Sequence, residues 1–141
     1  MAGMRGETSE LFDQGYSFIQ SLPVSQLHPF TYSERSSTQA LNIRPIVPMP
    51  ERHERTARLV ALSDQKLRDF YRQQMGHSLQ VLWEQPPRQK DGSFAPMHGF
   101  TGNYVRLQRS YDPALVNVCQ EVVLSQELIE TNQGPAIVVG G

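Results

Sequence analysis

The segment from Pro50 to Met75 constrains the fold of this chain most, because it predicts one long helix with both ends defined. Pro50 suits the first position of a helix, and Gly76 falls just past the last turn, where glycine commonly ends a helix. Between them, apolar residues recur at helical spacing along one stripe. After Gly76 the apolar residues alternate with polar ones, as in a half-buried strand. The chain therefore divides into two regions, residues 1–76 and residues 77–141.

The first region opens with a Gly-rich turn that leads directly into a short helix. Thr8 is placed to cap this helix, and Glu10 lies in its first turn, where the helix dipole favours an anion. Pro23 ends it. Residues 26–33 predict a strand, although Pro29 lacks a donor for a sheet ladder. The order helix, strand, loop and long helix is part of a βαβ pattern, so we expect either a piece of a larger sheet or a complete small α+β domain.

The second region predicts five short strands. In the first strand Leu79, Val81 and Trp83 alternate with polar residues, so Trp83 is expected to be buried. Five short strands separated by turn-forming loops are typical of a small closed antiparallel barrel of the oligonucleotide-binding type. Cys119 lies in an apolar strand and is expected to be a small buried hydrophobe. The four remaining predicted strands are residues 94–101, 104–109, 116–127 and 136–139.

Composition and charge narrow the possible functions. The net charge of −1 gives no overall attraction to a polyanion, but positive charge gathers on residues 44–72 while residues 77–141 are slightly acidic. The single cysteine, Cys119, excludes an internal disulfide and any metal site built from several cysteines. No apolar run is long enough to span a bilayer, and the first residues lack the apolar core of a signal peptide. We therefore expect a cytoplasmic protein with no membrane partner.

Several stretches carry motifs that occur together in one family. Residues 3–8, Gly-Met-Arg-Gly-Glu-Thr, form a Gly-x-x-Gly-Glu-Thr turn before a helix. Residues 27–40 are similar to the pattern Phe-x-Tyr-Ser-x-Arg-x-Gly-Thr-x-Ala, except that Ser37 stands where glycine is common. These stretches resemble the end of the barrel of the radical-SAM methylthiotransferases. Residues 51–55 resemble the family's basic linker helix, and the region after Gly76 resembles its TRAM module.

The resemblance implies an α+β chain that is the C-terminal part of a tRNA methylthiotransferase: the end of its radical-SAM α/β barrel with the linker helix, then a TRAM β-barrel. The full enzyme would use two 4Fe-4S clusters and S-adenosylmethionine, both tied to domains upstream in the same polypeptide. It would add a methylthio group to carbon two of a modified adenosine next to the anticodon of tRNA. The cluster cysteines are missing here, so we expect no catalytic residue, metal or cofactor in this chain.

The residues around the predicted loop most resemble the branch of the family that acts on threonylcarbamoyladenosine. The isopentenyladenosine and ribosomal-protein branches remain alternatives, as does a non-catalytic RNA-binding adaptor with no missing domain. An upstream three-cysteine motif in the same reading frame would favour the enzyme over the adaptor.

Ten residues are candidates for binding. Tyr32, Ser33 and Arg35 follow the predicted strand at its carboxyl end, where the active sites of barrels form, so they are expected to line a substrate or cofactor pocket. The candidates for RNA binding are Arg52, Arg55, Arg58, Phe100, Tyr104, Arg106 and Arg109.

Two kinds of chemistry underlie the RNA-binding candidates. The three helix arginines recur every third residue, so they are expected to share one face and contact phosphates, unless they form a solvated face paired with nearby glutamates. The two aromatic rings are suited to stacking on unpaired bases, with the two strand arginines holding the backbone, unless the rings fill the barrel core.

Overall fold

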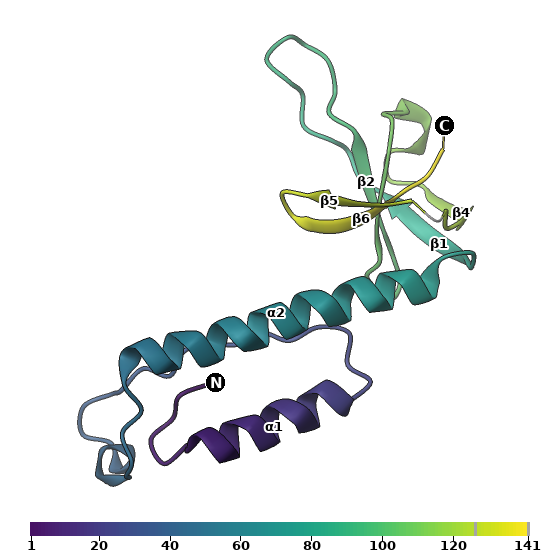
Figure 1. The fold of residues 1–141 in the computed structure, drawn as a ribbon. Coiled ribbons are helices and arrows are strands. Elements are labelled where there is room, and N and C mark those ends of the chain that lie inside the picture. The colour runs from purple at the N-terminus through teal and green to yellow at the C-terminus, as the bar shows by residue number, and fades with distance from the viewer. Residues whose placement is uncertain (126, 141) are drawn as a thin grey trace. The chain divides into compact units, whose positions relative to one another are not determined.

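The computed structural model describes residues 1–125 and 127–140. Its contacts group the chain into two compact units, Met1–Leu67 and Arg68–Gly141. The fold is α+β, with helices first and a six-stranded sheet after them (Figure 1). The division between the units falls within the long helix, and the domain boundary after residue 76 stays a prediction. The helical elements are α1 Ser9–Ser21, the 3-10 turn η1 Gln39–Asn42, α2 Met49–Gln74 and the 3-10 turn η2 Pro113–Leu115.

Helix α1 begins and ends as predicted. The Thr8 hydroxyl accepts a hydrogen bond from the backbone N–H of Leu11 at 3.3 Å, and the helix ends before Pro23. Its apolar face is only partly covered. Phe12 is buried in a cluster with Ala2 and with Leu59 of α2, whereas Phe18 is 64% exposed. The first unit therefore leaves part of the predicted apolar stripe in contact with solvent.

Residues 26–33 form no strand, which corrects the prediction. The segment has one isolated parallel bridge, between Ala2 and Thr31, with backbone hydrogen bonds of 2.9 Å. Nearby, the Ser63 hydroxyl of α2 accepts from the Leu27 N–H at 2.9 Å and donates to the Leu27 carbonyl at 3.0 Å. The β-branched and aromatic residues favoured a strand, but a strand also needs a neighbouring ladder, which residue type alone does not supply.

Helix α2 lies within one residue of its predicted bounds at both ends. Gly76 follows it with φ of +81°, the left-handed conformation that glycine adopts readily after a helix. The helix buries Leu59 and Leu62 in the first unit and Tyr71 in the second. Across residues 1–125 and 127–140, no helix has the length and apolar character needed to cross a membrane.

The second unit is built on one mixed sheet with the strand order β4-β1-β2-β3-β6-β5. Each neighbouring pair is antiparallel except β3 and β6, which run parallel. Within the described residues the two edge strands, β4 and β5, do not pair with each other, so the hydrogen-bonded sheet is open. The strands are β1 Ser78–Trp83, β2 Met97–Thr101, β3 Arg106–Arg109, β4 Cys119–Val123, β5 Leu128–Thr131 and β6 Gly134–Val138.

This sheet corrects the predicted five-stranded antiparallel barrel. The additional strand, β5, belongs to a tight hairpin in which Thr131 pairs with Gly134 across a two-residue turn. Gly134 has φ of +99°, a conformation that glycine adopts readily and that would strain an L-residue. The alternation of apolar residues locates strands but does not reveal their direction, so the parallel pair was not predictable from it.

Trp83 lies at the centre of the second unit, which confirms its predicted burial. It is fully buried, and its indole N–H donates to the Gln120 side chain at 3.1 Å. Gly99 pairs with it across β1 and β2, and a Cβ there would lie 2.7 Å from the Trp83 ring. In contrast, Cys119 is exposed, so the expectation of a buried thiol was wrong. Cys119 begins an edge strand, where an apolar neighbourhood in sequence does not ensure burial.

Candidate functional site

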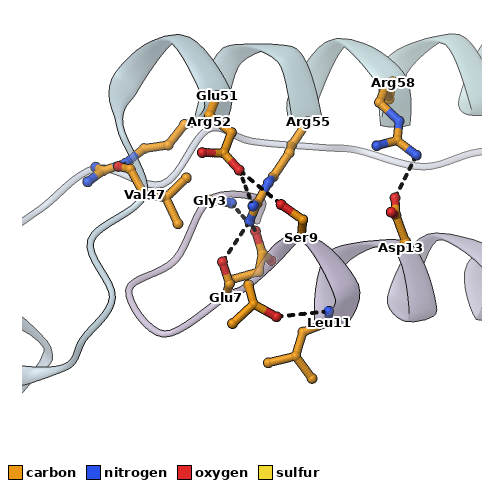
Figure 2. Close-up of polar contacts among 11 residues, drawn as sticks. Gly3, Glu7, Ser9, Leu11, Asp13, Val47, Glu51, Arg52, Arg55 and Arg58 are labelled. Atoms are coloured by element: carbon orange, nitrogen blue, oxygen red, sulfur yellow. Dashed lines mark hydrogen bonds and ion pairs between the residues drawn. The ribbon is translucent and has the colours of Figure 1, made fainter.

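A buried ion-pair network ties the first turn of the chain to α2 (Figure 2). Arg55 Nη1 donates to Glu7 Oε2 at 2.7 Å and to the Glu7 carbonyl oxygen at 2.9 Å, and its Nη2 pairs with Glu51. The Gly3 N–H donates to the same Glu7 oxygen at 2.7 Å. Burial opposes the charge of Arg55, but the hydrogen bonds to Glu7 and Glu51 outweigh it and raise its pKa. The Gly-rich turn thus has a fixed position against α2.

Arg52 makes the second part of the network and holds the loop that follows residue 32. Its Nε donates to the Val47 carbonyl at 2.7 Å, its Nη1 to the Tyr32 carbonyl at 3.3 Å, and its Nη2 to Glu34 Oε1 at 3.0 Å. Arg5 Nε donates to the same Glu34 oxygen at 2.8 Å. Hydrogen bonds from Arg5 and then from Arg52 lower the pKa of Glu34. Two cations therefore anchor the loop through one carboxylate.

A hollow of about 360 Å³ opens in the first unit at this loop, and we call it the loop hollow. All three residues predicted for a pocket, Tyr32, Ser33 and Arg35, line it. Tyr32 is buried, whereas Ser33 and Arg35 are exposed. The lining residues are Met1, Thr31, Tyr32, Ser33, Arg35, Thr38 and Ala40.

A second hollow, of about 390 Å³, lies on the sheet of the second unit, and we call it the sheet hollow. Both predicted aromatic residues, Phe100 and Tyr104, line it. Leu82 pairs with Phe100 on one side and with Cys119 on the other, so three side chains form a row across three strands. Tyr104 is 82% exposed and has φ of +65°. The remaining lining residues are Gln80, Glu84, Thr101 and Gly102.

The two predicted strand arginines do not line the sheet hollow. Arg106 is buried: its backbone N–H donates to the Tyr71 hydroxyl at 2.9 Å, and its Nη1 donates to Thr131 at 3.0 Å. The Arg109 guanidinium lies 5.6 Å from the centre of the Trp83 ring. Sequence proximity to the aromatic residues suggested a shared site, but the register of the strands and the end of α2 direct both arginines to packing contacts.

Comparison with known proteins adds to this geometry. No protein-family model matches the chain. It is 33% identical, over 76% of its length, to the threonylcarbamoyladenosine tRNA methylthiotransferase MtaB of Bacillus subtilis, covering 24% of that protein. It is 30% identical over 70% of its length to the tRNA-2-methylthio-N(6)-dimethylallyladenosine synthase of Streptomyces coelicolor, and 26% identical over 65% to the ribosomal protein uS12 methylthiotransferase RimO of Cytophaga hutchinsonii, covering 20% of each.

The chain is related to the methylthiotransferases. It spans a fifth to a quarter of the length of these relatives. Methylthiotransferases with different named substrates match it at similar identity, so identity alone does not select a branch.

In the present chain the three helix arginines do not share one exposed face, which corrects the expectation from their spacing. The side chains of Arg52 and Arg55 are only 6% and 5% exposed. Arg58 is 43% exposed and pairs with Asp13 at 2.8 Å. The helix face that carries Arg52 and Arg55 packs against segments distant in sequence, which supply Glu34 and Glu7, and Glu51 of α2 also pairs with Arg55. A phosphate can therefore reach Arg58 but not the other two, and RNA contact by Arg58 stays a prediction.

The described residues do not fit an iron–sulfur cluster. No group of three or more His, Cys, Asp or Glu side chains comes together within residues 1–125 and 127–140. The single cysteine of the chain, Cys119, cannot supply the cysteine set that a four-iron cluster requires. If the reaction of the methylthiotransferases involves such a cluster, other residues must hold it.

Proposed function

We propose that the chain is the C-terminal part of a tRNA methylthiotransferase that adds a methylthio group to carbon two of threonylcarbamoyladenosine next to the anticodon. The 33% identity to a protein of that name, over 76% of this chain, carries the proposal. The isopentenyladenosine and ribosomal-protein branches are the alternatives, because relatives named for both also match.

In this proposal the first unit closes a radical-SAM barrel, and the loop hollow forms part of the substrate or cofactor pocket. Tyr32, Ser33 and Arg35 position the bound molecule, and the Arg52–Glu34 pair keeps their loop in place. The chemistry of S-adenosylmethionine and two 4Fe-4S clusters would come from upstream domains of the same polypeptide, which are its partners. Because the substrate is tRNA, we propose a cytoplasmic location.

The second unit, in this proposal, is a TRAM module that holds tRNA through its sheet hollow. The exposed ring of Tyr104 and the half-buried ring of Phe100 offer faces on which unpaired bases stack, worth roughly 1–3 kcal/mol for each base. Stacking tolerates any base, so this contact would hold the anticodon loop without reading its sequence. Glu84 also lines the hollow, so phosphates are expected to lie outside it.

The decisive experiment is nucleoside mass spectrometry of tRNA from a strain whose gene for this protein has been deleted. We expect threonylcarbamoyladenosine to lose its methylthio group while dimethylallyladenosine keeps it, and the intact gene to restore the modification. Loss from dimethylallyladenosine instead would move the protein to the other tRNA branch. No change in either nucleoside would overturn the proposed tRNA reaction.

A further inference from the structure

Glu34 and Arg35 are neighbours in sequence with opposite electrostatic environments, and only Arg35 lines the loop hollow. The Glu34 carboxylate accepts hydrogen bonds from both Arg5 and Arg52, at 2.8 and 3.0 Å. No acid pairs with the exposed side chain of Arg35 among the ion pairs of the described residues. The one acidic residue nearest to Arg35 in sequence is thus already engaged by other cations.

The loop holds Arg35 at the hollow through a closed turn. The Thr38 hydroxyl donates to the Arg35 carbonyl at 2.9 Å, and Ser37 between them adopts φ of +63°, a conformation that L-residues rarely take. Both Arg35 and Thr38 line the loop hollow. The Arg35 side chain therefore extends from a turn that is closed by a hydrogen bond and lines the hollow.

The other lining groups give the hollow a mixed character. Tyr32 and Ala40 contribute apolar surface, and Ser33 contributes a hydroxyl. The Thr31 hydroxyl is occupied by Thr56, at 2.9 Å. A ligand that fits these walls has an apolar body and one negatively charged group.

We propose that Arg35 anchors the oxyanion of a ligand, a carboxylate or a phosphate, whose body lies in the loop hollow. The inference rests on the proposed function of this hollow as part of a substrate or cofactor pocket. A guanidinium offers two parallel N–H donors that match the geometry of a carboxylate or phosphate, and such charge-assisted bonds are about twice as strong as neutral ones. Three sources carry this chemistry: the carboxylate of a threonylcarbamoyl group, the carboxylate of S-adenosylmethionine, and a nucleotide phosphate.

The test is an NMR titration of the ¹⁵N-labelled chain with N6-threonylcarbamoyladenosine, S-adenosylmethionine, adenosine 5′-monophosphate and neutral adenosine. We expect at least one anionic ligand to shift the amides of residues 31–38. Arg35→Gln should raise the Kd of that ligand by about tenfold. The affinity for adenosine, which has no anion, should change less than twofold. Lys90→Gln removes the same charge from an exposed loop of the second unit and should leave every Kd unchanged.

The ligand that loses affinity in Arg35→Gln identifies the source of the oxyanion. Equal loss for adenosine and the anionic ligands would mean that Arg35 only shapes the hollow, and would overturn the inference. An absence of shifts with all four ligands would overturn it as well. Neither result bears on the tRNA nucleoside analysis, so failure of this inference and failure of the proposed function are distinguishable. Amide shifts outside residues 31–38 report whether Arg35→Gln keeps the native fold.

Discussion

Arg55 donates two hydrogen bonds to a single residue, Glu7: one to its carboxylate at 2.7 Å and one to its carbonyl oxygen at 2.9 Å. The two residues lie far apart in sequence, and the contact fixes the Gly-rich turn against α2 (Figure 2). Since the Arg55 side chain is 5% exposed, removal of either partner leaves an uncompensated buried group. The pair therefore matters more to the fold of the first unit than an exposed ion pair would.

Arg55→Ala should lower the free energy of unfolding of the first unit by about 3 kcal/mol, since it leaves Glu7 without its buried partner. Arg58→Ala is the matched control. The two guanidinium groups lie 5.3 and 4.7 Å from the Phe12 ring, but Arg58 is exposed, so its loss should cost less than about 1 kcal/mol. Hydrogen exchange of the α1 amides measures both changes. Similar losses in the two variants would show that contact with Phe12, rather than the ion pair, supports the helix.

Gly3→Ala should destabilise the same turn strongly. A Cβ at this position would lie 2.3 Å from Arg52 Cγ, and φ of +80° is unfavourable for any L-residue. Gly15→Ala is the opposite case, because a Cβ added there would have no atom within 4 Å and the site is inside α1. That change should stabilise the helix by roughly 0.5–1 kcal/mol. Thermal unfolding monitored by far-ultraviolet circular dichroism should shift in opposite directions in the two variants. A Gly3→Ala variant as stable as the native protein would contradict the close packing at Gly3, and a destabilised Gly15→Ala variant would contradict the open space at Gly15.

His98 should make the second unit sensitive to acid. Burial, and then the positive charge of Arg106, lower its pKa below the ordinary 6.5, whereas the Leu107 backbone and Glu84 act weakly in the other direction. In mildly acidic solution the unfolded chain takes up a proton at this residue more readily than the folded chain. The stability that neutral His98 provides is present above pH 6.5 and is lost as the pH falls through 6.5 toward the lowered pKa.

His98→Gln should therefore flatten the dependence of stability on pH between about 7.5 and 5.5. Denaturant titration followed by the fluorescence of Trp83, in the same unit, gives the free energy of unfolding at each pH. The control is His77→Gln, which replaces an exposed histidine and should leave the dependence as it is in the native protein. A slope in His98→Gln as steep as in the native protein would assign the acid sensitivity to other groups.

The features that depend on local spacing could be predicted from the sequence. The features that depend on partners distant in sequence could not. The bounds of α2 and the cap of α1 at Thr8 follow from residues within one turn. The burial of Arg55 does not follow from nearby residues. Glu7, which compensates its charge, lies far away in sequence, in the turn before α1. The segment of residues 26–33 likewise finds hydrogen-bond partners in Ala2 and in a side chain of α2, which no local pattern indicates.

The same limit applies to the candidate site. The residues of the loop hollow are neighbours in sequence, so one motif located Tyr32, Ser33 and Arg35 together. The sheet hollow is assembled across three strands, and only the register shows that Cys119 shares it with Phe100. Alternation along one strand does not contain that information.

The exposed ring of Tyr104 should supply affinity for RNA that is independent of salt. Tyr104→Gly removes the ring and relieves the left-handed backbone, so weaker binding of an anticodon stem-loop cannot come from added strain. We expect about a tenfold rise in Kd, within the range for one stacked base, and little change for Tyr104→Phe. Val123→Ala, which shortens a 66% exposed residue on β4 outside the sheet hollow, is the control and should leave Kd unchanged.

Salt dependence separates this stacking contact from phosphate contacts. Neutralising one phosphate of a single strand contributes about 0.7 to the slope of log affinity against log salt. Arg58→Glu should therefore flatten the slope by about this amount, whereas Tyr104→Gly should lower affinity at every salt concentration without changing the slope. Arg52 and Arg55 are unsuitable for this test, because their reversal would place a negative charge inside the first unit. If Tyr104→Gly binds the stem-loop as tightly as the native protein, the sheet hollow is not the RNA contact.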